Sequence, residues 1–275
     1  MAGNGHVPFD VGKEGGAKLR ALRNACGLTQ LTVELEASLG TGYLQRVESG
    51  RVQQPERETL QRILDALAAT FAQRRDVLET FGYAVTITPP LPQDIAWAIQ
   101  QTEPMLHKVS FPAYLLTCTH HLLAWNVAAE ALFRQVGIQN LANFQSTPIF
   151  HLFFQGILPS IHNPAEFLTA VVQALRHEIS KFQHEAWCIS LIESLLQDLP
   201  LFKTHWELTA SNPPSVVAAR PLVPLEIAPI IGGKLKFRIT AEPLTADPRF
   251  RVVYYLPADV TTLQLYTHER SIFSP

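Results

Sequence analysis

Five short amphipathic segments follow one another between residues 17 and 81, with short connections and no strand-like alternation. In "AKLRALRNAC" the residues Leu19, Leu22 and Cys26 recur at spacings of three and four, which places them on one helix face, and Gly27 ends the helix. Four more segments, "QLTVELEAS", "TGYLQRVES", "ERETLQRILDALAAT" and "FAQRRDVLETFGY", favour helices in the same way. The pattern predicts an all-α domain at 17–81, after a flexible, glycine-rich leader at 1–16.

The 275 residues are 47% hydrophobic and 17% charged, which leaves a large apolar fraction to be buried in a core or around a cavity. No apolar run approaches the roughly 18 residues that a membrane span needs. The first 16 residues lack the basic and apolar regions of a signal peptide. We therefore expect a cytoplasmic protein without a membrane partner.

Cysteines and net charge point to no special chemistry. The three cysteines, Cys26, Cys118 and Cys188, are far apart in sequence and form no C-x-x-C pair, so neither a disulfide framework nor a zinc ribbon is indicated. A net charge of -2 does not by itself indicate a nucleic-acid binder. Any role in DNA binding has to come from local geometry.

The helical periodicity ends at the proline-rich stretch "GYAVTITPPLP", and we interpret residues 82–94 as a linker. A second domain at 95–275 begins with a helix and continues with two strand-like runs in "PAYLLTCTHHLLAWN". Three further helices are expected in "VAAEALFRQVG", "HNPAEFLTAVVQALRHEISK", with Asn163 as its N-cap, and "HEAWCISLIESLLQDL". "STPIFHLFFQGIL" is expected to be helical as well. The last third is expected to be sheet, with "PLEIAPII", "KLKFRITAE" and "RFRVVYYLP" as strands and Gly232-Gly233 as a hairpin turn. This is an α+β arrangement with one antiparallel sheet.

The stretch "TGYLQRVESGR", residues 41–51, presents a polar face opposite its apolar residues Tyr43, Leu44 and Val47. Glutamine and arginine carry paired donors and acceptors that match adenine and guanine edges in the major groove. A short helix that exposes both, after a tight turn from another short helix, is typical of a helix-turn-helix. A plain surface helix would show the same polar face.

Residues 18–67 resemble the Cro/CI (Xre) helix-turn-helix in "LRALR", "GLTQ", "YLQRVESGR" and the downstream "P" and "TL" before "ILDAL". The resemblance makes 41–49 the recognition helix and implies phosphate contacts near the start of the preceding helix. Glu48 would tie helices together. The sequence departs from the family at Glu34, where a small alanine is usual, and at Ser38, where a turn glycine is usual. The implied DNA-binding residues are Thr29, Gln30, Thr41, Gly42, Tyr43, Gln45, Arg46 and Arg51.

Residues from about 95 to 260 resemble the PAS-like ligand-binding domain of MmyB-like transcription regulators. The resemblance lies in "LLAWN" followed by "AAEALF", in "LFKTHWEL" and in "FRVVYYLPAD". It implies a sheet curved around a small-molecule cavity and a fatty-acid-like ligand. The aromatic residues of "IFHLFFQGIL" could line such a pocket, and so could other apolar residues, although any one of them could equally fill the core. A carboxylate ligand would need a polar anchor such as His151, Arg220 or Tyr254. The candidate ligand-binding residues are Leu123, Trp125, Phe133, Phe150, His151, Phe153, Phe154, Arg220, Phe237 and Tyr254.

Metal binding and catalysis are not favoured. His120 and His121 are expected to point to opposite faces of a strand, and no H-E-x-x-H occurs. Neither a G-x-S-x-G elbow, a P-loop nor a G-x-G-x-x-G is present. No cofactor is therefore expected.

These observations predict a transcription regulator, not an enzyme, that binds a double-stranded operator as a homodimer and responds to a small apolar ligand. Two alternatives stay open. In one, the second domain has a solid core and acts as a dimerisation or protein-docking module. In the other, the pocket turns over a lipid-like substrate.

Overall fold

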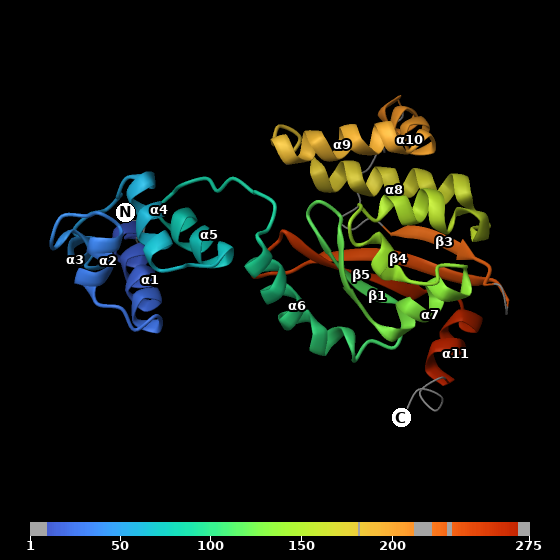
Figure 1. Cartoon of the computed structure of the whole chain (residues 1–275), viewed down its shortest axis with the longest axis horizontal. Coiled ribbons are helices and arrows are strands. Elements are labelled where there is room, and N and C mark those ends of the chain that lie inside the picture. The colour runs from blue at the N-terminus through green and yellow to red at the C-terminus, as the bar shows by residue number, and fades with distance from the viewer. Residues whose placement is uncertain (1–9, 181, 212–221, 230–232, 269–275) are drawn as a thin grey trace, which may run out of the picture. The chain divides into compact units, whose positions relative to one another are not determined.

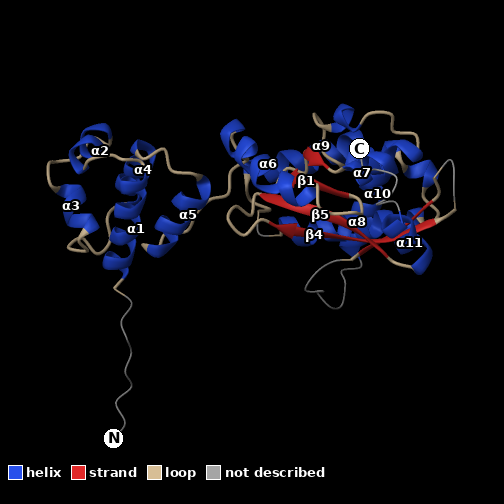
Figure 2. Cartoon of the chain, turned by 90° about the horizontal axis from the view of Figure 1, so that it is seen from below, coloured by secondary structure: helices blue, strands red, loops and turns tan. Residues whose placement is uncertain are grey.

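The computed structural model describes residues 10–180, 182–211, 222–229 and 233–268. The chain divides into two compact units, residues 1–86 and 87–275. In its described residues the first unit consists of helices and loops, whereas the second contains a sheet (Figure 2). The expected multidomain organisation, all-α and then α+β, is confirmed.

The described part of the first unit contains five helices (Figure 1). They are α1 (Val11–Ala25), α2 (Gln30–Glu36), α3 (Tyr43–Glu48), α4 (Arg57–Ala66) and α5 (Phe71–Thr80). One apolar cluster joins all five, with Leu19, Leu44, Leu60 and Phe81 among its buried residues. The helical periodicity of the sequence predicted this core.

Helix α1 begins at Val11, within the leader expected at 1–16. The Asp10 carboxylate caps it by accepting a hydrogen bond from the Lys13 amide at 3.1 Å. Gly16 is buried against α3, where a Cβ atom would collide with the carbonyl oxygen of Val47. Of the glycines that suggested flexibility, Gly12, Gly15 and Gly16 are therefore packing residues in the first turns of α1.

The sheet of the second unit has five antiparallel strands in the order β2-β1-β5-β4-β3. Their bounds are β1 (Ala113–Thr117), β2 (Leu122–Trp125), β3 (Val223–Ile227), β4 (Leu235–Pro243) and β5 (Phe250–Pro257). The expected turn between β3 and β4 falls partly on residues 230–232, outside the described residues. β3 and β4 are nevertheless antiparallel neighbours, but Ile227 pairs with Leu235, which is not the register that a two-residue turn at Gly232-Gly233 would give.

Helices cover both faces of this sheet (Figure 1). Helix α6 (Pro92–Leu106) packs on one face, against Leu115, Phe250 and Val252. The elements on the other side are α7 (Val127–Gln135), α8 (Pro164–Ile179), α9 (Ala186–Asp198) and α10 (Pro200–Ser211). They build the main core together with three short turns, η1 (Leu141–Phe144), η2 (Leu152–Gly156) and η3 (Leu158–Ser160).

Several expected elements differ in the structure. "STPIFHLFFQGIL" is helical only in part: it contains the π-helical turn η2, and the 3-10 turn η3 begins at its last residue, Leu158. Asn163 occupies the N-cap position of α8 as expected, but its side chain makes no capping hydrogen bond, because its Oδ1 accepts the Glu226 amide of β3 at 2.8 Å. The last third is not only sheet, since α10 and α11 (Val260–His268) are helices. Asp259 starts α11 by accepting the Thr262 amide at 2.8 Å, which offsets the β-branched residues of its first turn.

Candidate functional site

Helix α3 exposes polar side chains and buries its apolar ones. Leu44 and Val47 lie in the core, whereas Gln45 and Arg46 point to solvent. The guanidinium of Arg46 lies 5.5 Å from the centre of the half-buried Tyr43 ring, a distance that permits a cation-π contact. The helix therefore presents a glutamine and an arginine on one accessible face, and the arginine lies over the ring of Tyr43.

The N-terminus of α3 is held by a residue of α2. Gly42 occupies the cap position with φ of +79°, a left-handed conformation that glycine tolerates, and has no side chain with which to cap. Glu34 supplies the missing acceptors: its Oε2 accepts the Gly42 amide at 3.1 Å and its Oε1 accepts the Leu44 amide at 2.9 Å. The departure from the family pattern at Glu34 thus has a structural purpose, since the buried carboxylate joins α2 to α3.

Glu48, at the end of α3, ties three helices together. Its carboxylate accepts hydrogen bonds from the Arg23 guanidinium of α1 at 2.7 and 3.0 Å and from the Gln30 amide of α2 at 2.7 Å. Arg20 of α1 lies 3.5 Å from the same carboxylate. This is the structural role that the resemblance implied for Glu48. It also means that the side-chain amide of Gln30 is engaged within the protein.

The remaining candidate DNA-contact residues lie around α3. Thr29 is the exposed N-cap of α2 and accepts the Thr32 amide at 3.1 Å. Thr41 and Arg51, before and after α3, are exposed. The candidates thus fall on one short helix, the residues flanking it and the start of the helix before it.

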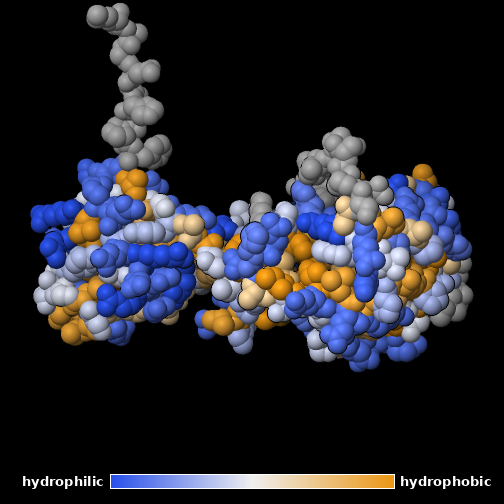
Figure 3. All heavy atoms as spheres, turned by 90° about the horizontal axis from the view of Figure 1, so that it is seen from above, coloured by the Kyte–Doolittle hydropathy of each residue, from blue (hydrophilic) through white to orange (hydrophobic). Residues whose placement is uncertain are grey.

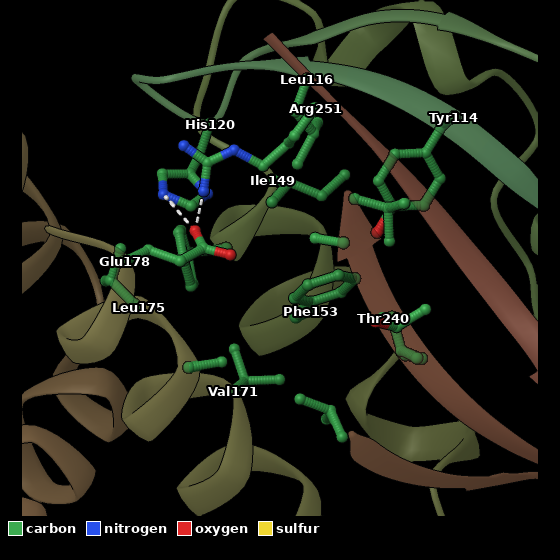
Figure 4. A pocket seen from close by; sticks show the side chains of 16 residues that line it. Tyr114, Leu116, His120, Ile149, Phe153, Val171, Leu175, Glu178, Thr240 and Arg251 are labelled. Carbon is green, nitrogen blue, oxygen red and sulfur yellow. Dashed lines mark ion pairs between the residues drawn. The ribbon is translucent and has the colours of Figure 1, made fainter. Parts of the chain in front are cut away.

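The second unit contains a pocket between α8 and the face of the sheet opposite α6, with a cavity volume of about 90 Å³. Figure 4 shows side chains from β1, β5 and α8 converging on it. Apart from His120, Glu178 and Arg251, the pocket is lined by Tyr114, Leu116, Ile149, Phe150, Phe153, Val171, Ala174, Leu175, Val223, Ile239, Thr240, Ala241 and Val253. Its wall is therefore mainly apolar, as in many small-molecule sites.

Three ionisable side chains meet in one part of this pocket (Figure 4). Nη1 of Arg251, on β5, pairs with Oε2 of Glu178, on the last turn of α8. Nε2 of His120 lies 3.5 Å from the same oxygen. Burial lowers the pKa of His120 well below its usual range, and the charge of Arg251 lowers it further, so the imidazole is neutral at pH 7. Burial lowers the pKa of Arg251 to about 10, and the guanidinium stays charged.

His120 reaches the pocket because it does not lie on a strand. It occupies the turn between β1 and β2 with φ of +61°, and its ring is buried. The expectation that His120 and His121 alternate across a strand was wrong, since the strands end at Thr117 and resume at Leu122. In the part of the chain that the structure describes, no three His, Cys, Asp or Glu residues form a group that could hold a metal ion.

Of the nine candidate ligand-binding residues that the structure describes, two line the pocket: Phe150 and Phe153. Phe133, Phe154 and Phe237 are buried in the main core, and Trp125 packs against it. Leu123 and Tyr254 lie on the opposite face of the sheet, with α6, where the Tyr254 hydroxyl donates to Sδ of Met105. His151 is hydrogen-bonded through Nδ1 to the Pro148 carbonyl oxygen at 3.2 Å. Arg220 lies outside the described residues.

The polar residues of the pocket were missed by sequence reasoning. A signal for Arg251 was present, because a charged residue inside the apolar run "FRVVYYL" of a strand is rarely buried without a partner. Its partner Glu178 lies 73 positions away, and no spacing rule connects a helix end to that strand. Tyr254 follows Val253, which lines the pocket, and a shift of one residue on a strand moves a side chain to the other face.

Comparisons with known proteins cover both units. The family model described as "MmyB-like transcription regulator ligand binding domain" matches residues 99–266. The model of a helix-turn-helix domain matches residues 16–77. The first match falls on the unit that contains the pocket, and the second falls on the unit that contains α3.

No curated protein matches the chain. Among solved structures, an RNA-binding light-oxygen-voltage receptor is similar with a TM-score of 0.29 and 10% sequence identity. The match covers 95% of this chain, and the chain spans 64% of the length of that receptor. So distant a likeness carries no argument about the fold or the function.

Proposed function

The chain belongs to the MmyB-like transcription regulators, and from this membership we propose that α3 reads an operator while an acidic, fatty-acid-like ligand in the second unit modulates that binding. The helix-turn-helix and the ligand-binding domain make it a ligand-responsive transcription regulator. The observation that carries the finer proposal is the mainly apolar pocket with a buried arginine in its wall.

In the proposed complex, α3 lies in the major groove. Gln45 and Arg46 contact base edges, with Thr41, Gly42 and Tyr43 close to the DNA at the start of the helix. Thr29 and Arg51 contact phosphates on either side. Gln30, whose side-chain amide holds Glu48, contributes its backbone N–H to a phosphate.

Replacing Arg46 tests this placement. Arg46→Ala is expected to lower the affinity for an operator selected from random duplexes by about 1–3 kcal/mol and to relax base preference at one position. Arg134→Ala, which removes the same charge from an exposed position on α7 of the other unit, is the control and should leave both unchanged. An Arg46→Ala variant that keeps the wild-type base preference would sink the proposal that α3 reads the operator.

The protein is proposed to bind DNA as a homodimer, because a single short recognition helix reads few base pairs and two half-sites one helical turn apart provide the usual specificity. Light scattering of the operator-bound protein should give twice the protein mass of the 30.6 kDa chain. One chain per operator would contradict this.

The ligand is proposed to lie with its apolar part against Phe150, Phe153 and α8, and with its acidic group near Arg251. A cavity of about 90 Å³ is smaller than the roughly 300–1,000 Å³ of many ligand sites. A long acyl chain would thus require Phe150, Phe153 or α8 to move. Short and medium chains need less rearrangement.

Comparing the native mass of the purified protein with its denatured mass tests for a bound amphiphile. A released fatty acid in near-stoichiometric amount, or a rise in melting temperature with added decanoic acid, is expected. No released molecule and no shift with any fatty acid would favour the alternative of a docking module.

One observation supports that alternative. Apolar side chains are exposed on the face of the second unit shown in Figure 3, and Ile189 of α9 and Leu201 and Leu208 of α10 are among the exposed large hydrophobic residues. Such exposure suits contact with another protein surface.

A regulator with these two families of domain is proposed to act in the cytoplasm, without catalysis. None of the helices in the described ranges combines the length and apolarity needed to cross a bilayer. Conversion of added decanoic acid by the pure protein would overturn the non-enzymatic assignment.

A further inference from the structure

Arg251 already has a counter-ion. Its Nη1 atom pairs with Oε2 of Glu178, and the neighbouring His120 is neutral because burial lowers its pKa. The two opposite charges cancel, so this part of the pocket offers no net positive charge to an acidic ligand (Figure 4). A ligand carboxylate that entered without any rearrangement would add an uncompensated negative charge to a largely buried place, which is costly.

Binding of an acid therefore requires one of the two existing charges to leave, and the two differ in their freedom to do so. The Arg251 side chain is 11% exposed, and β5 lies inside the sheet between β1 and β4. The Glu178 side chain is 25% exposed, and it lies on the last turn of α8, which ends at Ile179. Glu178 can rotate into water at lower cost than Arg251 can.

A vacancy left by Glu178 would also suit a ligand carboxylate. Within the described residues, Nε2 of His120 is buried and lacks a hydrogen-bond partner. A carboxylate bound to Arg251 would lie beside this nitrogen and could accept its hydrogen. Buried polar groups that lack partners are uncommon, and a ligand that satisfies one gains affinity.

We propose that Glu178 is a displaceable counter-ion: the carboxylate of an acidic amphiphile takes its place on Arg251, and the last turn of α8 loses its tie to the sheet. The inference rests on the proposed function of the pocket as a site for such ligands. It also explains why an acid would affect the protein differently from a neutral amphiphile of equal chain length, since only the acid can replace Glu178 on Arg251. Helix α8 packs on α10 and β3, so release of its last turn is the structural change by which the protein responds to the acidic group of a ligand.

Matched probes and one variant test the exchange. Decanoic acid and 1-decanol share their chain and differ in charge. In Glu178→Gln the competing carboxylate is gone, so affinity for decanoic acid should rise about tenfold over wild type, which corresponds to roughly 1.4 kcal/mol. Affinity for 1-decanol should stay unchanged. Calorimetric titration measures both constants, and Glu193→Gln on α9 serves as a charge-matched control.

A second measurement uses the wild-type protein and does not depend on the stability of the variant. Hydrogen exchange of the amides in 175–179 should become faster when decanoic acid is bound and should not change in this way with 1-decanol. The exchange is overturned if both probes bind wild type and Glu178→Gln with the same relative affinity and leave the last turn of α8 equally protected. That result would leave the ligand pocket itself intact. If neither probe binds either protein, the pocket proposal fails as well.

Discussion

At the scale of single residues, Glu48 shows how a buried charge is stabilised in this protein. Its side chain is inaccessible to solvent, and it accepts hydrogen bonds from Arg23 and Gln30. Burial by itself raises the pKa of a carboxyl group, but here the hydrogen bonds and charges outweigh it, and the pKa of Glu48 is lowered. The folded first unit therefore favours the ionised form.

This lowered pKa predicts a pH dependence of stability. A carboxyl group with a depressed folded-state pKa contributes stability above its unfolded value of 4.5, and the contribution is lost as the pH falls through the lower folded value. Glu48→Gln should lower the free energy of unfolding at pH 7 by about 3 kcal/mol, since Arg23 loses its charged partner. It should also weaken the pH dependence below 4.5.

Urea unfolding followed by circular dichroism between pH 3 and pH 7 measures both effects. Glu36→Gln, at an exposed position of α2, makes the same chemical change away from the network and should stay within about 0.5 kcal/mol of wild type. Equal stability of the two variants at pH 7 would contradict the role given to Glu48.

At the scale of elements, α3 is too short to be stable by itself. It has six residues, whereas isolated helices shorter than about 12 are marginal in water. Packing of Leu44 and Val47 and the two hydrogen bonds to Glu34 hold it in place. The proposed recognition helix thus depends on a carboxylate from the preceding helix.

Removing that carboxylate is expected to affect DNA binding and folding together. Glu34→Ala leaves the Gly42 and Leu44 amides without acceptors and should cost about 2 kcal/mol of stability, comparable to the loss of a strong helix cap. Operator affinity measured by fluorescence anisotropy should fall as well. Glu36→Ala is the matched control, and a Glu34→Ala protein with unchanged stability would show that α3 is held in another way.

The elements that followed a clear period were predictable from the sequence. Helix α8 buries the residues that its spacing of 3.6 selects. Strand β4 buries Leu235, Phe237 and Ile239 as its spacing of 2 selects, but it then buries Thr240 and leaves Ala241 only partly buried. Helix α11 was not predictable in this way, since Val260, Thr261 and Thr262 favour strands and only the Asp259 cap opposes them.

The pocket was the least predictable feature. Its position depends on which face of the sheet each strand residue meets, and its polar residues come from a turn, a helix end and a strand. Phe150 and Phe153 could be chosen because aromatic bulk is visible in a sequence. The pairing of Arg251 with Glu178 is a tertiary contact that no local pattern encodes.

At the scale of the whole molecule, a regulator needs a coupling between its two units. A ligand changes operator affinity only if it binds the DNA-competent and incompetent states with different affinities, and typical couplings of 1–3 kcal/mol change affinity by about 5- to 150-fold. A coupling free energy of either sign fits this description: one sign raises operator affinity when the ligand binds, and the other lowers it.

The most direct measurement of the central claim is operator affinity of the full chain by fluorescence anisotropy, with and without saturating decanoic acid. Ala174→Phe, which fills the pocket from α8, and His177→Phe, at an exposed position of the same helix, are the paired variants. We expect decanoic acid to change the affinity of wild type and His177→Phe at least about fivefold and that of Ala174→Phe not at all. Identical operator affinities with and without the acid in wild type, under conditions where the acid raises the melting temperature, would contradict a ligand-responsive regulator.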